Sequence, residues 1–163
     1  SGFYLGTWTS SLGGGSQYEL DLYAGFGDEA GQVSYDVGVI QYMYPVDEDA
    51  ELDFNELYGS VGFGPVTASL AYTLGKEADV DDENDLYYSL AGDFPMKDDL
   101  SVGVLVGGYD FESDAAEDYT HFQVNVSKGD FTFAVDKASD FVDNTTVEED
   151  PRVSVSWNHA IDL

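Results

Sequence analysis

The sequence predicts an all-β fold: one antiparallel up-and-down β-barrel of ten strands, forming a single domain over residues 1–163. Three observations predict it. Apolar and polar residues alternate with a period of two, which places them on opposite faces of a strand. The alternating segments recur at intervals of roughly 16 residues. The connections between them alternate between long acidic loops and short turns.

The alternation defines each strand in turn. The expected strands cover residues 3–9, 18–26, 34–39, 56–63, 66–73, 86–91, 101–107, 121–127, 131–136 and 152–158. In the second, one face carries Tyr18, Leu20, Leu22, Ala24 and Phe26, and the other carries Glu19, Asp21, Tyr23 and Gly25. The apolar faces of the later strands carry, in order, Tyr35, Val37 and Val39; Leu57, Val61 and Phe63; Val66, Leu70 and Tyr72; Leu86, Tyr88 and Leu90; Val102, Val104 and Val106; Phe122, Val124 and Val126; Phe131, Phe133 and Val135; Val153, Val155 and Trp157. A helix would scatter these sets around its axis.

The connections predict two different ends. Long, mostly acidic connections cover residues 12–17, 46–53, 75–85, 112–118 and 140–151, and short ones cover 27–32, 62–65, 95–99 and 129–130. In an up-and-down meander these two sets lie at opposite ends of the strands. Short turns at one end and longer loops at the other are typical of bacterial outer-membrane barrels. The sequence therefore predicts a transmembrane β-barrel in the lipid bilayer of a bacterial outer membrane.

A soluble β fold that encloses an apolar ligand is the alternative, because it also predicts alternation. In that fold Leu20, Val37, Val104 and Val124 would pack together in a central core. The polar face is rich in Gly, Ser, Thr, Tyr, Asn and Gln, which suits a wet interior better than an outer surface. Strands of about 9–11 residues match a tilted membrane crossing. Aromatic residues near the strand ends predict interfacial girdles, with Phe26, Phe63, Phe94 and Phe131 at the turn end and Tyr44, Phe54, Tyr87 and Tyr109 at the loop end.

Composition excludes several classes of function. The net charge of −28, with only five Lys and Arg residues, excludes nucleic acid as a partner, because phosphates would be repelled. No stretch approaches the ~18–20 apolar residues of a membrane helix. The chain has no Cys, and its two histidines, His121 and His159, lie in different expected strands. Neither a zinc-protease motif nor a nucleophile elbow is present. We therefore expect no enzymatic activity.

Polar residues of the alternating face are the candidate binding residues. The expected lumen-lining residues are Glu19, Asp21, Tyr23, Asp36, Glu56, Tyr58, His121, Gln123, Asn125, Asp136 and Arg152. If the carboxylates among them share one level, they form a ring that favours cations. Alternatively, they hydrogen-bond to Arg152, Tyr23 and Tyr58 and fill a narrow interior. The sequence leaves both readings open.

Two acidic runs suggest loose cation binding. Their carboxylates alternate at two-residue spacing in Asp47, Asp49, Glu51 and Asp53, and again in Asp79, Asp81, Glu83 and Asp85. Such oxygens are ligands for Ca²⁺ and Mg²⁺, but the central Gly and terminal Glu of an EF-hand are absent. We expect a solvated acidic loop in each case, with loosely associated Ca²⁺ or Mg²⁺ and no other cofactor.

Several stretches resemble the TorF porin family, a group also catalogued as an uncharacterised proteobacterial family. They are Gly2-Phe3-Tyr4-Leu5-Gly6-Thr7-Trp8, residues 18–25, Ser34-Tyr35-Asp36-Val37-Gly38-Val39, Tyr42-Met43-Tyr44-Pro45, Glu56-Leu57-Tyr58-Gly59-Ser60, Tyr87-Tyr88-Ser89-Leu90 and the region 94–111. The resemblance covers most of the chain, through strand and turn patterns. It implies an outer-membrane barrel with a further hairpin before Gly2, hence twelve strands, or ten if this chain is the complete mature product. The chain ends at Leu163, without the terminal aromatic residue that outer-membrane proteins commonly carry.

The resemblance and the acidic inner face together lead us to expect a passive pore for small hydrophilic solutes that favours cations. The alternative is a non-conducting structural or interaction barrel. Its acidic extracellular loops would bind cations or assemble with other copies into a homo-oligomer.

Overall fold

The computed structural model describes residues 2–12, 18–45, 52–77, 84–113, 116–140 and 150–159. They form a single antiparallel sheet whose strand order follows the chain. The strands are β1 (Phe3–Ser11), β2 (Tyr18–Ala30), β3 (Val33–Met43), β4 (Phe54–Phe63), β5 (Val66–Lys76), β6 (Leu86–Pro95), β7 (Leu100–Asp110), β8 (Tyr119–Lys128), β9 (Phe131–Asp140) and β10 (Arg152–Trp157). The prediction of ten strands in an up-and-down meander is confirmed.

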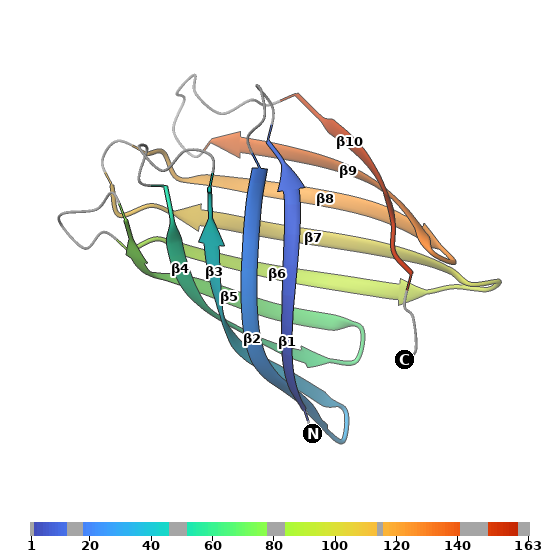
Figure 1. The fold of residues 1–163 in the computed structure, drawn as a ribbon. Helices are drawn as coiled ribbons and strands as arrows, with labels where there is room; N and C mark the ends of the chain where they lie inside the picture. The colour runs from blue at the N-terminus through green and yellow to red at the C-terminus, as the bar shows by residue number, and fades with distance from the viewer. Residues whose placement is uncertain are drawn as a thin grey trace.

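The sheet curls strongly, and β1 and β10 form its two edges (Figure 1). These edge strands are not hydrogen-bonded to each other, so the described sheet is open. Among the described residues there is no helix long and apolar enough to span a membrane.

Three of the four tight turns contain two residues, Gly31–Gln32, Gly64–Pro65 and Gly129–Asp130. The glycine comes first in each, with φ of 70°, 58° and 56°. Glycine at positive φ in the first position is the arrangement of a type II′ hairpin turn. The turn expected at 27–32 is therefore shorter than predicted. β2 continues to Ala30 because Gly27 and Asp28 still pair with β3.

The apolar rows of the strands lie on the outer, exposed face. Val37 is 50% exposed, Val104 36% and Val124 37%. The buried residues Asp21, Glu56, Thr73 and Ala134 belong instead to the opposite rows. These opposite rows form the inner face, which is the concave one. The prediction that the apolar rows face outward is confirmed, and the alternative of an enclosed apolar core is wrong.

Neighbouring strands are staggered. A pairing row is the line of residues, one from each strand, that are directly paired from strand to strand across the sheet. The row that starts at Phe3 continues through Phe26, Val37, Gly59, Leu70, Tyr88, Gly108 and Thr120 to Ser139. Phe3 is the first residue of β1, whereas Ser139 lies eight residues beyond Phe131, the first residue of β9. The row thus shifts by about one residue per strand. With ~3.3 Å per residue and ~4.8 Å between strands, that shift corresponds to a strand tilt of about 35°.

Candidate functional site: the inner face

The structure places all eleven predicted lumen-lining residues in the rows of the inner face. Side chains from strands that are not neighbours meet there. The Tyr4 hydroxyl, on β1, lies 2.7 Å from the Tyr58 hydroxyl on β4 and donates to Asp36 Oδ1 on β3 at 2.8 Å. Because a side chain of β1 reaches β3 and β4, neither of which is its neighbour in the sheet, this face must curve inward.

A single pairing row on the inner face carries five tyrosines, and we call these five the tyrosine row. The row passes through Tyr4, Gly25, Gly38, Tyr58, Ala71, Tyr87, Tyr109 and Tyr119, one residue from each of β1 to β8. It starts at the turn end of β1 and finishes at the loop end of β8. The strand stagger thus carries a line of phenol rings obliquely along the inner face from one end to the other.

Glycines make room for the first two rings of this row. A Cβ at Gly25 would lie 2.3 Å from the Tyr4 hydroxyl, and a Cβ at Gly38 would lie 2.3 Å from the Tyr58 hydroxyl. Tyr23 lies in the same way over Gly6, where a Cβ would be 2.3 Å from the ring. Each ring lies across its directly paired neighbour, a position open only to a residue without a side chain.

At the other end of the row, Tyr87, Tyr109, Tyr119 and His121 form a cluster of four rings. Ring centroids are 4.7 Å apart for Tyr87 and Tyr109, 5.4 Å for Tyr109 and Tyr119, and 5.7 Å for Tyr87 and His121. The Tyr87 hydroxyl is 3.1 Å from His121 Nε2, above Gly107. The prediction that Tyr87 and Tyr109 belong to an interfacial girdle is therefore wrong, because both point inward.

Other predicted girdle residues divide between the faces. Phe63, Phe94 and Phe131 are 62%, 42% and 59% exposed at the turn end. Phe54 instead stacks on Tyr42 of an inner row, with ring centroids 4.3 Å apart. Of the predicted girdle residues, Phe63, Phe94 and Phe131 therefore face outward at the turn end, whereas Phe54, Tyr87 and Tyr109 face inward at the loop end.

The inner carboxylates lie at different heights and form no ring. Asp36 is four residues beyond Gln32 of the β2–β3 turn, and Asp136 is six beyond Asp130 of the β8–β9 turn. Glu56 lies eight residues before Gly64, and Asp21 lies ten before Gly31. Negative charge is thus distributed along the inner face rather than gathered at one level.

Asp21 and Glu56 are the deepest carboxylates. Their exposed fractions are 4% and 6%, and Thr73, paired with Glu56, is 1% exposed. The Thr73 hydroxyl donates to Glu56 Oε1 at 3.5 Å, beside a register shift between β4 and β5. Such irregularities redirect side chains. Asp21 Oδ1 is buried without a hydrogen-bond partner among the described residues.

A polar ladder follows β8 and β9. Gln123 Nε2 donates to Asp136 Oδ1 at 2.5 Å, and Asn125 Nδ2 donates to Gln123 Oε1 at 3.3 Å. Arg152 on β10 is paired in register with Asp136. Amide, carboxylate and guanidinium groups therefore line this part of the inner face.

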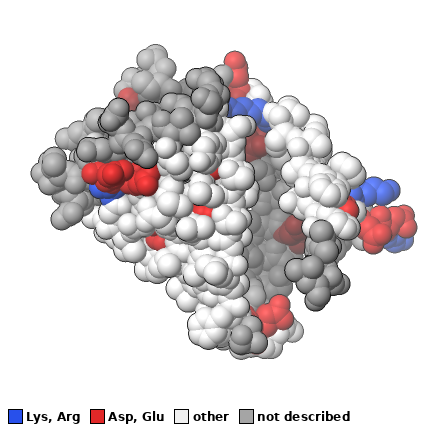
Figure 2. Space-filling view, viewed as in Figure 1, with Lys and Arg blue, Asp and Glu red and all other residues white. Residues whose placement is uncertain are grey.

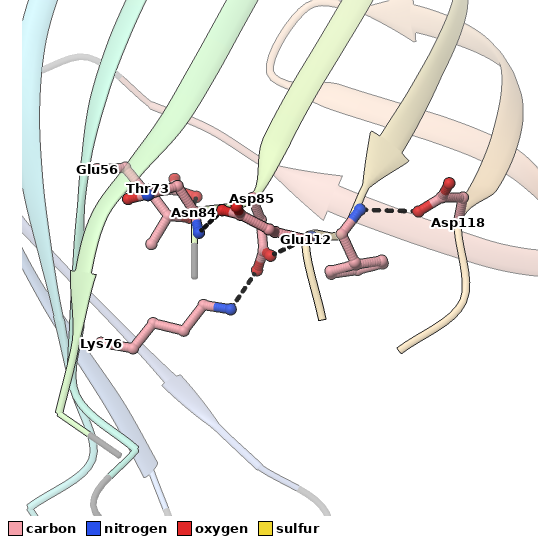
Figure 3. Close-up of polar contacts among 8 residues, drawn as sticks. Glu56, Thr73, Lys76, Asn84, Asp85, Glu112 and Asp118 are labelled. Atoms are coloured by element: carbon pink, nitrogen blue, oxygen red, sulfur yellow. Dashed lines mark hydrogen bonds and ion pairs between the residues drawn. The ribbon is translucent and has the colours of Figure 1, made fainter. Parts of the chain in front are cut away.

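Carboxylates also tie the loop ends together (Figure 3). Asp85 accepts a hydrogen bond from the backbone N–H of Glu112 at 3.3 Å and lies 2.9 Å from Lys76 Nζ. Asp53 accepts one from the N–H of Tyr44 at 2.8 Å. The Tyr44 hydroxyl donates to Glu19, and burial, assisted by that carboxylate, raises the pKa of Tyr44.

The predicted cation ligands are thus only partly observed. Asp53 and Asp85 each accept a hydrogen bond from a backbone N–H group. The other six predicted ligands lie outside the described residues: Asp47, Asp49, Glu51, Asp79, Asp81 and Glu83. Within the described ranges no three acidic or histidine side chains come together in a way that could hold a metal ion.

A family model described as a bacterial protein of unknown function, Gcw_chp, matches residues 1–156. The chain belongs to this family. No curated protein and no solved structure matches it. The family carries no assigned activity, so the TorF resemblance and the pore stay predictions that depend on the geometry of the two faces.

The inner face of this family member offers hydroxyl, amide, carboxylate and phenol groups on one continuous wall. Sequence reasoning missed Tyr4, Tyr109 and Tyr119 as inner-face residues, although their positions in the period-two pattern could have revealed them. His159 lies apart from His121, 2.9 Å from Asp130 at the turn end. The wall therefore suits non-covalent contact with hydrophilic molecules.

Proposed function

We propose that this chain is an outer-membrane β-barrel that forms a passive pore for small hydrophilic solutes and favours cations. The observation that carries the proposal is the arrangement of the two faces: the apolar rows are exposed on the outer face, and the buried polar residues Asp21, Glu56 and Thr73 lie on the inner face. Water would be a poor solvent for so extensive an apolar surface, whereas lipid chains would match it.

The distribution of charge supports a membrane setting. Charged residues in the described outer rows are Asp28, Asp110, Lys128 and Lys137, each within three residues of a strand end. Figure 2 shows the same division on one side of the molecule, with charged side chains mainly toward the ends of a largely uncharged surface. An uncharged band between polar ends is the pattern expected for a surface that crosses a bilayer.

The strand stagger supports closure into a barrel. Strands tilt by about 35–45° in closed barrels, and the stagger between β1 and β9 corresponds to a tilt at the lower end of that range. β1 and β10 would meet as antiparallel neighbours, since an up-and-down meander of ten strands gives its first and last strands opposite directions. Closure would remove the two unpaired edges, which lipid cannot hydrogen-bond.

The charge of the inner rows supports a preference for cations. Their carboxylates belong to Glu19, Asp21, Glu29, Asp36, Glu56, Asp93 and Asp136. The Lys and Arg residues of the described inner rows are Arg152, the first residue of β10, and Lys76, the last residue of β5, which is paired with Asp85. An excess of carboxylates lowers the energy of a cation along the wall and raises that of an anion.

Conductance in planar lipid bilayers tests the pore. We expect ohmic channels, with a reversal potential in a KCl gradient that reports preference for K⁺ over Cl⁻. Protein from the same preparation, unfolded before addition, is the control. Folded protein that inserts into the bilayer and passes no current at any voltage would remove the pore.

A non-conducting barrel is the second candidate, and one observation favours it. The contact between Tyr4 and Tyr58 joins side chains from β1 and β4 and occupies part of the interior. Such a barrel would act through its acidic loops. Sizing in detergent would then reveal oligomers that form with Ca²⁺ or Mg²⁺ and dissociate with a chelator.

A further inference from the structure

We infer that the tyrosine row is a binding track for neutral sugars, with its principal subsite at the four-ring cluster. This inference rests on the proposed pore and names the class of solute that the inner face recognises. Three independent features of the inner face carry it: the path of the rings, the polar groups beside them, and a pocket with balanced charge.

The path of the rings suits a solute that moves along the wall. Tyr4 is the second residue of β1, at the turn end, and Tyr119 is the first residue of β8, at the loop end. The row between them crosses eight strands without leaving the inner face. Phenol rings offer flat apolar faces with a polar tip. The C–H face of a sugar ring can pack on such surfaces one after another.

The polar groups beside the rings suit hydroxyl groups. The next inner row toward the turns passes through Asp36, Ser60, Ser69, Ser89, Gly107 and His121. Hydroxyl and imidazole groups can donate and accept hydrogen bonds, and a carboxylate accepts them, so this row can serve both the O–H donors and the oxygen acceptors of a polyol. An aromatic row beside a hydroxyl-rich row provides the two kinds of contact that a sugar presents on its face and its edge.

A pocket of about 460 Å³ lies at the loop end of the track. Its lining includes Tyr87, Tyr109, Tyr119, His121, Asp136 and Arg152. This volume falls within the range of small-molecule sites, which combine aromatic walls with a few fixed polar groups. The pocket is therefore large enough for a sugar unit held against the four-ring cluster.

The charge of this pocket indicates an uncharged ligand. Asp136 and Arg152, the inner-row charges of the lining, are paired in register and cancel, although the chain as a whole carries −28. Of the other charged lining residues, Asp150 precedes β10 and Lys137 belongs to an outer row. A site for a cation would keep a net negative charge, because aromatic rings and carboxylates then act together. A pocket without net charge favours an uncharged ligand whose hydroxyl groups donate hydrogen bonds to the carboxylate and accept them from the guanidinium group.

Calorimetric titration of the folded full chain in detergent with maltotriose tests the inference. We expect saturable binding that changes little with salt, and about tenfold weaker binding for Tyr119→Ala. Tyr119→Phe, which keeps the ring, should bind within about twofold of the parent chain. Tyr72→Ala is the matched control, since Tyr72 is a tyrosine of the outer face, 44% exposed.

Three results would overturn the inference: no heat of binding with the parent chain, equal binding by Tyr119→Ala, or binding of tetramethylammonium in place of maltotriose. Because the titration needs no current, its outcome is separate from that of the bilayer measurement. A conducting channel that ignores maltotriose would refute the sugar track and leave the pore. A chain that binds maltotriose without conducting would refute the pore and leave the subsite.

Discussion

Tyr4 and Tyr58 join their hydroxyl groups at 2.7 Å although two strands separate β1 from β4. The contact is possible because Gly25 and Gly38, on the intervening strands, provide no side chains beneath the two rings. One pairing row thus links four strands through two rings and two glycines. The curvature of the sheet and the position of these rings therefore depend on each other.

Substitution of Gly38 by Ala should disrupt this arrangement. The new Cβ would lie 2.3 Å from the Tyr58 hydroxyl and 2.7 Å from the backbone oxygen of Ala24. Since the backbone cannot move far within the sheet, the Tyr58 ring must leave its position and release Tyr4. We expect a loss of about 1–3 kcal/mol in the free energy of unfolding, measured by urea titration in detergent.

Gly75→Ala is the control for that substitution, because nothing lies within 4 Å of a Cβ at Gly75. Its free energy of unfolding should stay within about 0.5 kcal/mol of the parent value. Equal losses for the two variants would mean that the Tyr58 ring does not depend on Gly38.

The sequence was sufficient to predict the strands and the faces. Alternation assigned Val37, Val104 and Val124 to one face because side-chain direction in a strand depends only on parity. It could not predict the tyrosine row, since the register between strands depends on loop lengths and on how far each hairpin extends. Tyr87 and Tyr109 were assigned to an interfacial girdle because they lie close to the loop end. Their positions in the period-two alternation place them on the inner face, and this was the better guide.

The buried carboxylate of Asp21 should lower stability, and Asp21→Asn should raise it. Asp21 is 4% exposed and its Oδ1 lacks a hydrogen-bond partner among the described residues. A charge in that position has lost its hydration without full compensation. We expect Asp21→Asn to gain about 1 kcal/mol in the free energy of unfolding, measured in the same titration.

Asp36→Asn is the matched comparison, and we expect it to lower the free energy of unfolding, whereas Asp21→Asn should raise it. Asp36 Oδ1 accepts a hydrogen bond from Tyr4 at 2.8 Å. Replacing the charged acceptor by a neutral one weakens this bond, at a cost of about 1 kcal/mol. The reading of Asp21 as uncompensated fails if both variants lose stability to the same extent.

Arginine placed at different heights of the outer face should distinguish lipid from water. Val104 lies in the middle of β7 and is 36% exposed, whereas Leu100 is the first residue of that strand at the turn end. Arginine at a bilayer midplane costs about 2–4 kcal/mol, and about 0–1 kcal/mol near the interface. Folding into lipid vesicles should therefore be much less favourable for Val104→Arg than for Leu100→Arg. Equal effects would place this face in water.

Closure of the sheet can be tested by joining β1 to β10. Continuing the shift of about one residue per strand around a closed barrel gives a total stagger of about ten residues, which pairs Trp157 with Leu5. If the total stagger is two residues larger, which corresponds to a strand tilt of about 40°, Trp157 pairs with Thr7 instead. All three residues belong to outer-face rows, and the chain has no cysteine of its own.

Trp157→Cys combined with Leu5→Cys or with Thr7→Cys should form a disulfide on mild oxidation in lipid vesicles, since paired strands bring Cα atoms within the range a disulfide spans. The shift in electrophoretic mobility without reductant measures it. Ser156→Cys with Leu5→Cys is the control, because these residues lie on opposite faces and should not join. If neither Trp157 pair forms a disulfide while the chain is folded in vesicles, β1 and β10 do not close the barrel in this register, and the tilt derived from the strand pairing does not extend around it.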